Sequence, residues 1–173
     1  SGPLSIVFML GSLVLLMALL FIPPKYFFTK HILFIILIMS LGLFIYPYYQ
    51  SNREIFMHVG ITTFIMLIIL TVITFSFPKL IKDSWGIYLF IGLIGLLIAR
   101  VVEIFVAKKE PRTKMSKIIS YIAIVIFSLL VMYDTKNIIK NAENCVNPDY
   151  INESLSLFLD SINLFQNNFL LSN

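Results

Sequence analysis

Six long apolar runs restrict the fold of this chain more than any other feature of its sequence. They lie at roughly 5–22, 31–49, 57–77, 86–106, 116–136 and 150–171. Each run is long enough to cross the hydrocarbon core of a bilayer as a helix, which takes about 20 residues. The runs lack the alternation of a membrane β-barrel, and a helix satisfies its own backbone hydrogen bonds within lipid. We therefore expect an all-α integral membrane protein with six visible transmembrane helices.

The composition supports a lipid environment. Of the 173 residues, 59% are apolar and only 13% are charged, whereas a soluble domain is about half apolar and about a quarter charged. Such a chain has too few polar side chains to cover a water-exposed surface. Because the connectors between the runs are short, neighbouring helices must run antiparallel, and we expect residues 1–173 to form a single transmembrane domain.

The basic residues lie in the short connectors, although the formal net charge is +4. This arrangement argues against nucleic acid as a partner and favours contact with anionic lipid headgroups. Equal numbers of basic residues fall on the two sides of the expected bundle, so charge does not predict its orientation. The single cysteine, Cys145, belongs to no CxxC or Cys/His cluster. Zinc and redox roles therefore have no support, and we expect no resident cofactor.

Ionisable side chains within the apolar runs are the first candidates for function, because each costs about 2.5–3.5 kcal/mol at the centre of a membrane helix. The candidates are Arg100, Glu103, Asp134 and Asp160. Arg100 and Glu103 are three residues apart on one expected helix, so their side chains can meet. They form either a local ion pair near the interface or part of an ion path, and the sequence leaves both readings open.

The last apolar run carries a polar stripe. Glu153, Ser156, Asp160, Asn163 and Asn167 follow helical spacing and fall within an arc of about 80° on one helix face. We expect this stripe to face the bundle interior or water and to form a polar path. The alternative is an amphipathic helix lying flat at the interface, but such helices usually carry Lys and Arg on the polar face, and this stripe has neither.

Asp134 lies at the end of the preceding run, where two readings are open. It is either a helix-end carboxylate paired with Lys136 or Lys140, or it meets Asp160 across two adjacent helices. Two partly desolvated carboxyl groups that meet cannot easily both ionise, so they share one proton. The protonated pair is a hydrogen-bonded latch between helices, and the deprotonated pair repels itself and offers oxygen ligands to calcium. We therefore expect Asp134 and Asp160 to form a pH-sensing ion gate and to be the metal ligands.

The segments around these two aspartates resemble the closing signature of the transmembrane Bax inhibitor motif family. This family includes the lifeguard proteins, and the spacing here is most similar to its Bax inhibitor branch. The matching segments are 133–139 (YDTKNII), 142–143 (AE), 149–151 (DYI) and 157–165 (LFLDSINLF). Segments 60–75 and 92–105 resemble the middle helices of the family. The first two expected spans match the family only in length and hydropathy.

The resemblance implies a seven-helix bundle whose last helix is central, with the family's first helix missing from this chain. It implies a leak of cations, chiefly calcium, controlled by pH through an aspartate pair at Asp134 and Asp160. It also implies suppression of cell death from the endoplasmic reticulum, with the Golgi or a viral or bacterial membrane as alternatives. Calcium ions, protons and membrane proteins of the cell-death machinery are the implied partners, and no enzymatic activity is implied.

One departure from the family concerns a cation near the aspartates. Some members carry an arginine near the end of their second helix that engages the pair. The corresponding region here, 21–25 (FIPPK), has no arginine. The pair either lacks a cationic partner or uses Lys25 as a poor substitute.

Two other functions are compatible with these residues. A non-conducting protein that suppresses cell death by binding other membrane proteins would make both aspartates structural. An intramembrane aspartyl protease also needs two aspartates on neighbouring helices to activate water. Those proteases place the second aspartate in a Gly-x-Gly-Asp turn, whereas Asp160 follows the segment 157–159 (LFL), which disfavours this reading.

Overall fold

The computed structural model describes residues 2–106, 114–144 and 149–173, and the chain is helical throughout these ranges apart from short connections. The described residues contain six α-helices, one short 3₁₀ helix and no strand. The helices are α1 (Gly2–Phe21), α2 (Phe27–Ser51), α3 (Arg53–Ser76), η1 (Pro78–Leu80), α4 (Trp85–Val106), α5 (Lys114–Asn144) and α6 (Tyr150–Ser172). The all-α prediction is confirmed.

Four of the described helices, α2 to α5, are long and apolar enough to cross a membrane. The segment Gly11–Phe21 of α1 is a shorter apolar helix. Large apolar side chains are exposed along the outer faces of α2, α3 and α4, among them Met39, Phe64 and Phe90. A soluble protein would not expose apolar surface on this scale. These helices place the chain in a lipid bilayer as an integral membrane protein.

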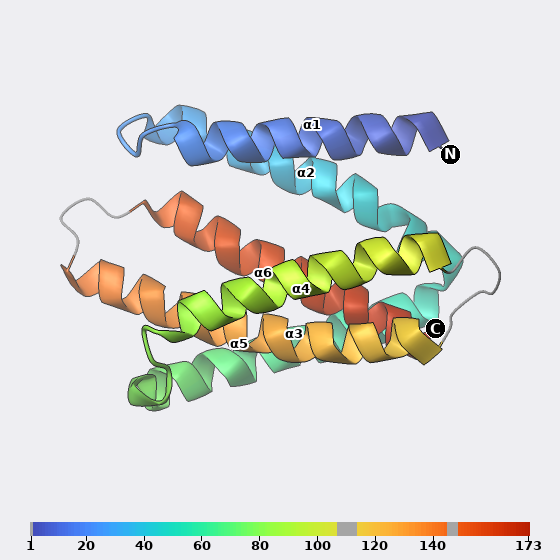
Figure 1. The fold of residues 1–173 in the computed structure, drawn as a ribbon. Coiled ribbons are helices and arrows are strands. Elements are labelled where there is room, and N and C mark those ends of the chain that lie inside the picture. Colours follow the sequence, from blue (N-terminus) through green and yellow to red (C-terminus); the bar gives the residue numbers. More distant parts are fainter. Residues whose placement is uncertain (1, 107–113, 145–148) are drawn as a thin grey trace.

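Helix α6 runs through the middle of the bundle (Figure 1) and packs against every other α-helix. On one side it meets α1 and α2 in a cluster of buried apolar residues, Leu19, Leu37, Ile151 and Leu155. On the other side, the fully buried Leu164 packs on α5, and Asn168 donates a hydrogen bond to Thr63 of α3 at 3.3 Å. The contact with α4 is made by Asn167. The last helix is therefore central, as predicted, and does not lie flat on the bundle surface.

Two helix boundaries differ from the sequence prediction. The second span was expected to cover roughly 31–49, but α2 begins at Phe27 and continues through Pro47 to Ser51. A proline removes one backbone hydrogen bond, and membrane helices tolerate this because neighbouring groups satisfy the freed carbonyl. Only Asn52 separates α2 from α3, and its side chain caps α3 by accepting from the amide of Ile55 at 3.0 Å. Similarly, α5 extends to Asn144, because residues 137–144 include no glycine or proline that would stop a helix.

An exposed ion cluster ties the α3–α4 connection to α5. Lys136 and Lys140 bind the two carboxylate oxygens of Asp83 at 2.7 and 3.3 Å. Lys136 also donates to the backbone carbonyl of Ile81 at 2.5 Å. The hydrogen bond from Lys136 and that from Lys140 hold the pKa of Asp83 below its usual value.

Replacing Asp83 by asparagine is expected to lower the melting temperature slightly at neutral pH and to lower it by less in acid. A carboxylate whose pKa is depressed by folding stabilises the protein above its unfolded pKa, and this contribution disappears as the pH falls through the folded pKa. The group is exposed, so the effect is small. Thermal unfolding in detergent at about pH 7 and about pH 3 measures it. An equal effect of Asp83→Asn at both pH values would contradict the ionic origin.

Candidate functional site

The structure brings Asp134 of α5 and Asp160 of α6 together. Their carboxyl groups face each other across the helix interface, and the hydroxyl of Ser156 donates to Oδ2 of Asp134. Asp160 is only 7% exposed, whereas Asp134 is half-buried. We call Asp134 and Asp160 the aspartate pair.

Helix packing positions the pair without a dedicated loop. The amide of Glu153 bonds the carbonyl of Asp149 at 3.1 Å, so α6 is helical from its first turn. Ser156 and Asp160 are then one turn apart on the helix face that meets α5. Two carboxyl groups can hydrogen-bond to each other only when a proton lies between them. Two carboxyl groups that face each other in this way are placed to share one proton.

One oxygen of the pair has no partner. Oδ2 of Asp160 is buried and accepts no hydrogen bond from any residue that the structure describes. A buried acceptor without a donor is unusual and costs about 1–3 kcal/mol. The pair therefore retains an unused oxygen that can accept a proton or contact a cation.

The alternative partners predicted for Asp134 bind elsewhere. Lys136 and Lys140 both bind Asp83, and Lys25 lies over the ring of Tyr26, 5.1 Å from its centroid. The groups acting on Asp134 within the described ranges are Ser156 and Asp160. The geometry therefore agrees with the interpretation in which Asp134 faces Asp160, and not with the one in which it pairs with Lys136 or Lys140.

The polar stripe on α6 borders two separate hollows, one on each side of Asp160. The first, which we call the acidic hollow, has a volume of about 250 Å³. It is lined by Asp134, Asn137, Ile138, Asn152, Glu153 and Ser156. The second, which we call the arginine hollow, has a volume of about 360 Å³. It is lined by Tyr48, Leu93, Leu96, Leu97, Arg100, Phe127, Asn163, Gln166, Asn167 and Leu170.

The predicted polar residues are thus divided between the hollows. Glu153 lies in the acidic hollow, where Asn141 donates to its Oε1 at 2.7 Å. Asn163 and Asn167 lie in the arginine hollow, and Asn167 also donates to the backbone carbonyl of Asn163 at 2.8 Å. The stripe is therefore interrupted by the buried Asp160, and the aspartate pair separates its two halves.

Arg100 has more partners than the sequence predicted. The expected pair with Glu103 is present at 2.7 Å. In addition, Arg100 donates to the hydroxyl of Ser120 at 2.8 Å and to Oδ1 of Asn167. One guanidinium group therefore bridges α4, α5 and α6. The position of Arg100 inside an apolar run marked it as a candidate in the sequence. Its partners Ser120 and Asn167 could not be predicted, because they are distant in the sequence.

A buried lysine was not predicted. Lys30 is 1% exposed, and its ammonium group donates to the carbonyl of Ile22 at 3.0 Å and to Oδ2 of Asp149. Asp149 caps α6, because its Oδ1 accepts from the amide of Asn152 at 3.3 Å. The ion pair therefore fastens the start of α6 to α2, and the bond to Ile22 fastens both to the α1–α2 connection. From the sequence, Lys30 is only a basic residue at the start of a span.

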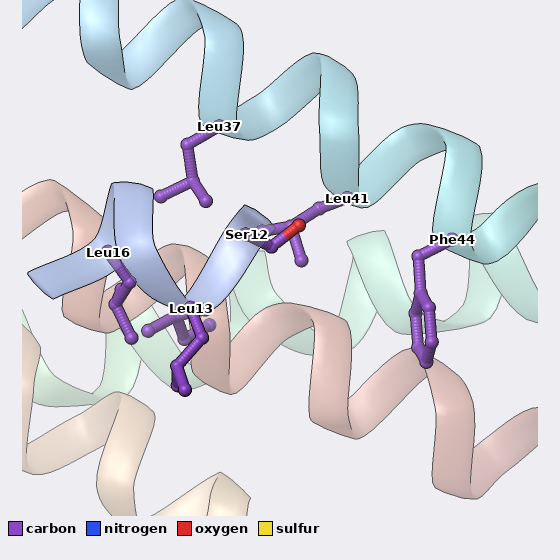
Figure 2. Close-up of a pocket in the computed structure, with 7 residues that line it drawn as sticks. Ser12, Leu13, Leu16, Leu37, Leu41 and Phe44 are labelled. Atoms are coloured by element: carbon purple, nitrogen blue, oxygen red, sulfur yellow. The ribbon is translucent and has the colours of Figure 1, made fainter. Parts of the chain in front are cut away.

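A further hollow between α1 and α2 has a different character (Figure 2). It has a volume of about 300 Å³ and is lined by Ser12, Leu13, Leu16, Leu37, Leu41, Phe44 and Leu159. Ser12 and Ser40 share a hydrogen bond at 2.7 Å. The residues that line this hollow carry no ionisable group, so it does not continue the polar stripe.

Metal ligation was predicted at the aspartate pair. Within the ranges described, no group of three or more His, Cys, Asp or Glu side chains is arranged to hold a metal ion. The pair itself offers two carboxyl groups. Cys145 and the basic residues Lys108, Lys109 and Arg112 lie outside the described residues.

Comparison with known proteins matches the chain to one family. A family model described as "Bax1-I: Inhibitor of apoptosis-promoting Bax1" matches residues 1–172 and so includes the first two helices. Protein LIFEGUARD 4 of Arabidopsis thaliana is 33% identical over 118 residues, which cover 66% of this chain and 45% of the relative. Protein LIFEGUARD 1 of the same plant is 32% identical over 118 residues, covering 66% and 47%. The chain thus spans about half the length of these curated relatives. No solved structure matches it.

Proposed function

Since this chain belongs to the Bax inhibitor family, which also includes the lifeguard proteins, we propose that it is a membrane protein that suppresses cell death. We propose further that it does so as a pH-sensitive calcium leak, gated by a proton shared between Asp134 and Asp160. The observation that carries this proposal is the contact between two carboxyl groups of different helices, with a polar hollow on each side.

The gate works through charge repulsion. With one proton shared, the carboxyl groups attract each other and hold α5 against α6. When that proton leaves, two negative charges face each other in a partly desolvated site, and like charges there repel strongly. The repulsion separates the helices at this point and frees carboxylate oxygens, which suit calcium. Calcium leak is therefore expected to rise as the pair loses its proton.

The other parts of the proposal follow from family membership. Calcium ions and protons are the partners of the site, and membrane proteins of the cell-death machinery are partners of the whole protein. The endoplasmic reticulum is the proposed location, and the protein is proposed not to be an enzyme. A non-conducting protein that acts by binding other membrane proteins is the competing proposal, and the flux experiment below separates the two.

The test is calcium flux from liposomes that contain the purified protein, measured across a range of pH. Wild-type flux is expected to depend on pH. Asp160→Asn holds the pair at the single negative charge of its one-proton, hydrogen-bonded form, so flux is expected to fall at least about tenfold at the pH where wild-type leak is greatest. The pH dependence is expected to disappear as well.

Glu143→Gln is the matched control, because it removes an exposed carboxylate from α5 outside both hollows. Its flux should equal that of wild type at every pH. Wild-type flux that ignores pH and is unchanged in Asp160→Asn would refute the gate. Absence of flux in a preparation that still binds partner membrane proteins would favour the non-conducting alternative.

A further inference from the structure

The polar face of α6 leads from the aspartate pair to Arg100. Ser156, one turn before Asp160, lines the acidic hollow, whereas Asn163 and Asn167 on the other side line the arginine hollow. These four residues lie on one face of the helix, since their spacing follows the helical repeat. A cation that passes the aspartate pair along this face therefore reaches the arginine hollow.

Arg100 places a permanent positive charge in that hollow. Its guanidinium stays protonated at any physiological pH, and its side chain is 27% exposed. Hydrogen bonds to Ser120 and Asn167 fix its position. Glu103 binds it at 2.7 Å and offsets part of its charge, but Glu103 is less exposed, at 16%, and does not line the hollow. A passing cation therefore meets the guanidinium more directly than the carboxylate that compensates it.

We infer that Arg100 determines the ion specificity of the leak, because its charge opposes divalent cations more strongly than monovalent cations. This inference rests on the proposed function. The energy of an ion in an electrostatic field is proportional to the charge of the ion. Removing the field of Arg100 therefore multiplies the flux of a monovalent cation by some factor and that of a divalent cation by about the square of that factor.

The test compares potassium and calcium flux in liposomes that contain the full chain. In Arg100→Gln, potassium flux is expected to rise about threefold and calcium flux about tenfold. Arg100→Lys keeps the charge but not the planar fork, so its calcium-to-potassium ratio should stay near that of wild type. Glu103→Gln removes the compensating charge, so it should reduce calcium flux more than potassium flux.

Arg53→Gln serves as the matched control. Arg53 begins α3, is exposed, and lies over the ring of Tyr49 at 5.7 Å from its centroid. It is not among the residues that line the arginine hollow. Loss of this charge is therefore expected to leave the calcium-to-potassium ratio unchanged.

The flux ratios of these variants distinguish the inference about Arg100 from its alternatives. A bundle that is merely loosened would raise both fluxes in Arg100→Gln by the same factor, and Arg100→Lys would do likewise, which would overturn the inference. An unchanged ratio, with a normal response to Asp160→Asn, would overturn the role of Arg100 and leave the proposed gate intact. Absence of flux in wild type would overturn both. If Arg100→Gln does not fold, as judged by its melting curve, Glu103→Gln provides the test. A lower calcium-to-potassium flux ratio in Glu103→Gln supports the inference, and an unchanged or higher ratio overturns it.

Discussion

Replacing Asp149 by asparagine is expected to destabilise the protein by about 3–5 kcal/mol, and replacing its partner Lys30 by methionine by less, about 1–3 kcal/mol. The difference follows from burial. Lys30 is 1% exposed, whereas the side chain of Asp149 is 24% exposed. Asp149→Asn leaves the buried ammonium group without a negative charge beside it, and one amide oxygen must then replace the two carboxylate oxygens that accept from Lys30 and from the amide of Asn152. Lys30→Met leaves a carboxylate that water can still reach and that still caps α6.

The measurement is thermal or urea unfolding of the two single variants and of the double variant in the same detergent. Because the double variant leaves no unpaired charge, it should recover much of the loss in Asp149→Asn. Lys25→Met, which removes an exposed lysine from the same connection, is the control and should change the stability little. A larger loss in Lys30→Met than in Asp149→Asn would show that the buried charge is not the dominant factor.

Asparagine at either member of the aspartate pair is expected to abolish the pH dependence of calcium flux, and asparagine at both is expected to add nothing. A shared proton belongs to the pair, so removing one carboxyl group removes the step in which the pair loses that proton, and the remaining carboxyl group titrates at lower pH without the repulsion of a neighbour. Independent groups would give additive effects instead, because substitutions at uncoupled sites add. We expect Asp134→Asn, Asp160→Asn and the double variant to share one flat pH profile.

The decisive measurement is the full set of four flux profiles across the pH range. The exposed Asp83 provides a control, because Asp83→Asn removes an aspartate that binds lysines away from the pair. Its pH profile should match that of wild type. A residual pH response in either single variant that disappears only in the double variant would show two independent sites and would contradict proton sharing.

Much of the fold could be predicted from hydropathy alone. Apolar runs of membrane-spanning length specify helices because no other single segment satisfies its backbone in lipid. The polar face of the last helix likewise predicted a position inside the bundle. The errors lay at the ends of helices, in α2 and after Lys136. The length of an apolar run in the sequence reflects the thickness of the bilayer, and a helix can continue beyond the run.

That Asp134 and Asp160 share a proton stays a prediction. Their approach was accessible from sequence, because helical spacing placed Asp160 on a polar face and a short connector placed Asp134 nearby. The pairings of Lys30 with Asp149 and of Arg100 with Asn167 were not. Their partners are 119 and 67 residues apart. Such contacts depend on how each helix is rotated against its neighbours, which hydropathy does not specify.

The central position of α6 has a consequence for how the chain enters a membrane. Among the described helices, α6 is not one of those apolar enough to span on its own, and an aspartate at the centre of a membrane helix costs about 2.5–3.5 kcal/mol. The five helices that surround α6 are all synthesised before it. We therefore expect α6 to insert into the membrane only after those helices have assembled into a partly open bundle. Insertion of α6 and its packing against the other helices would then occur in one step.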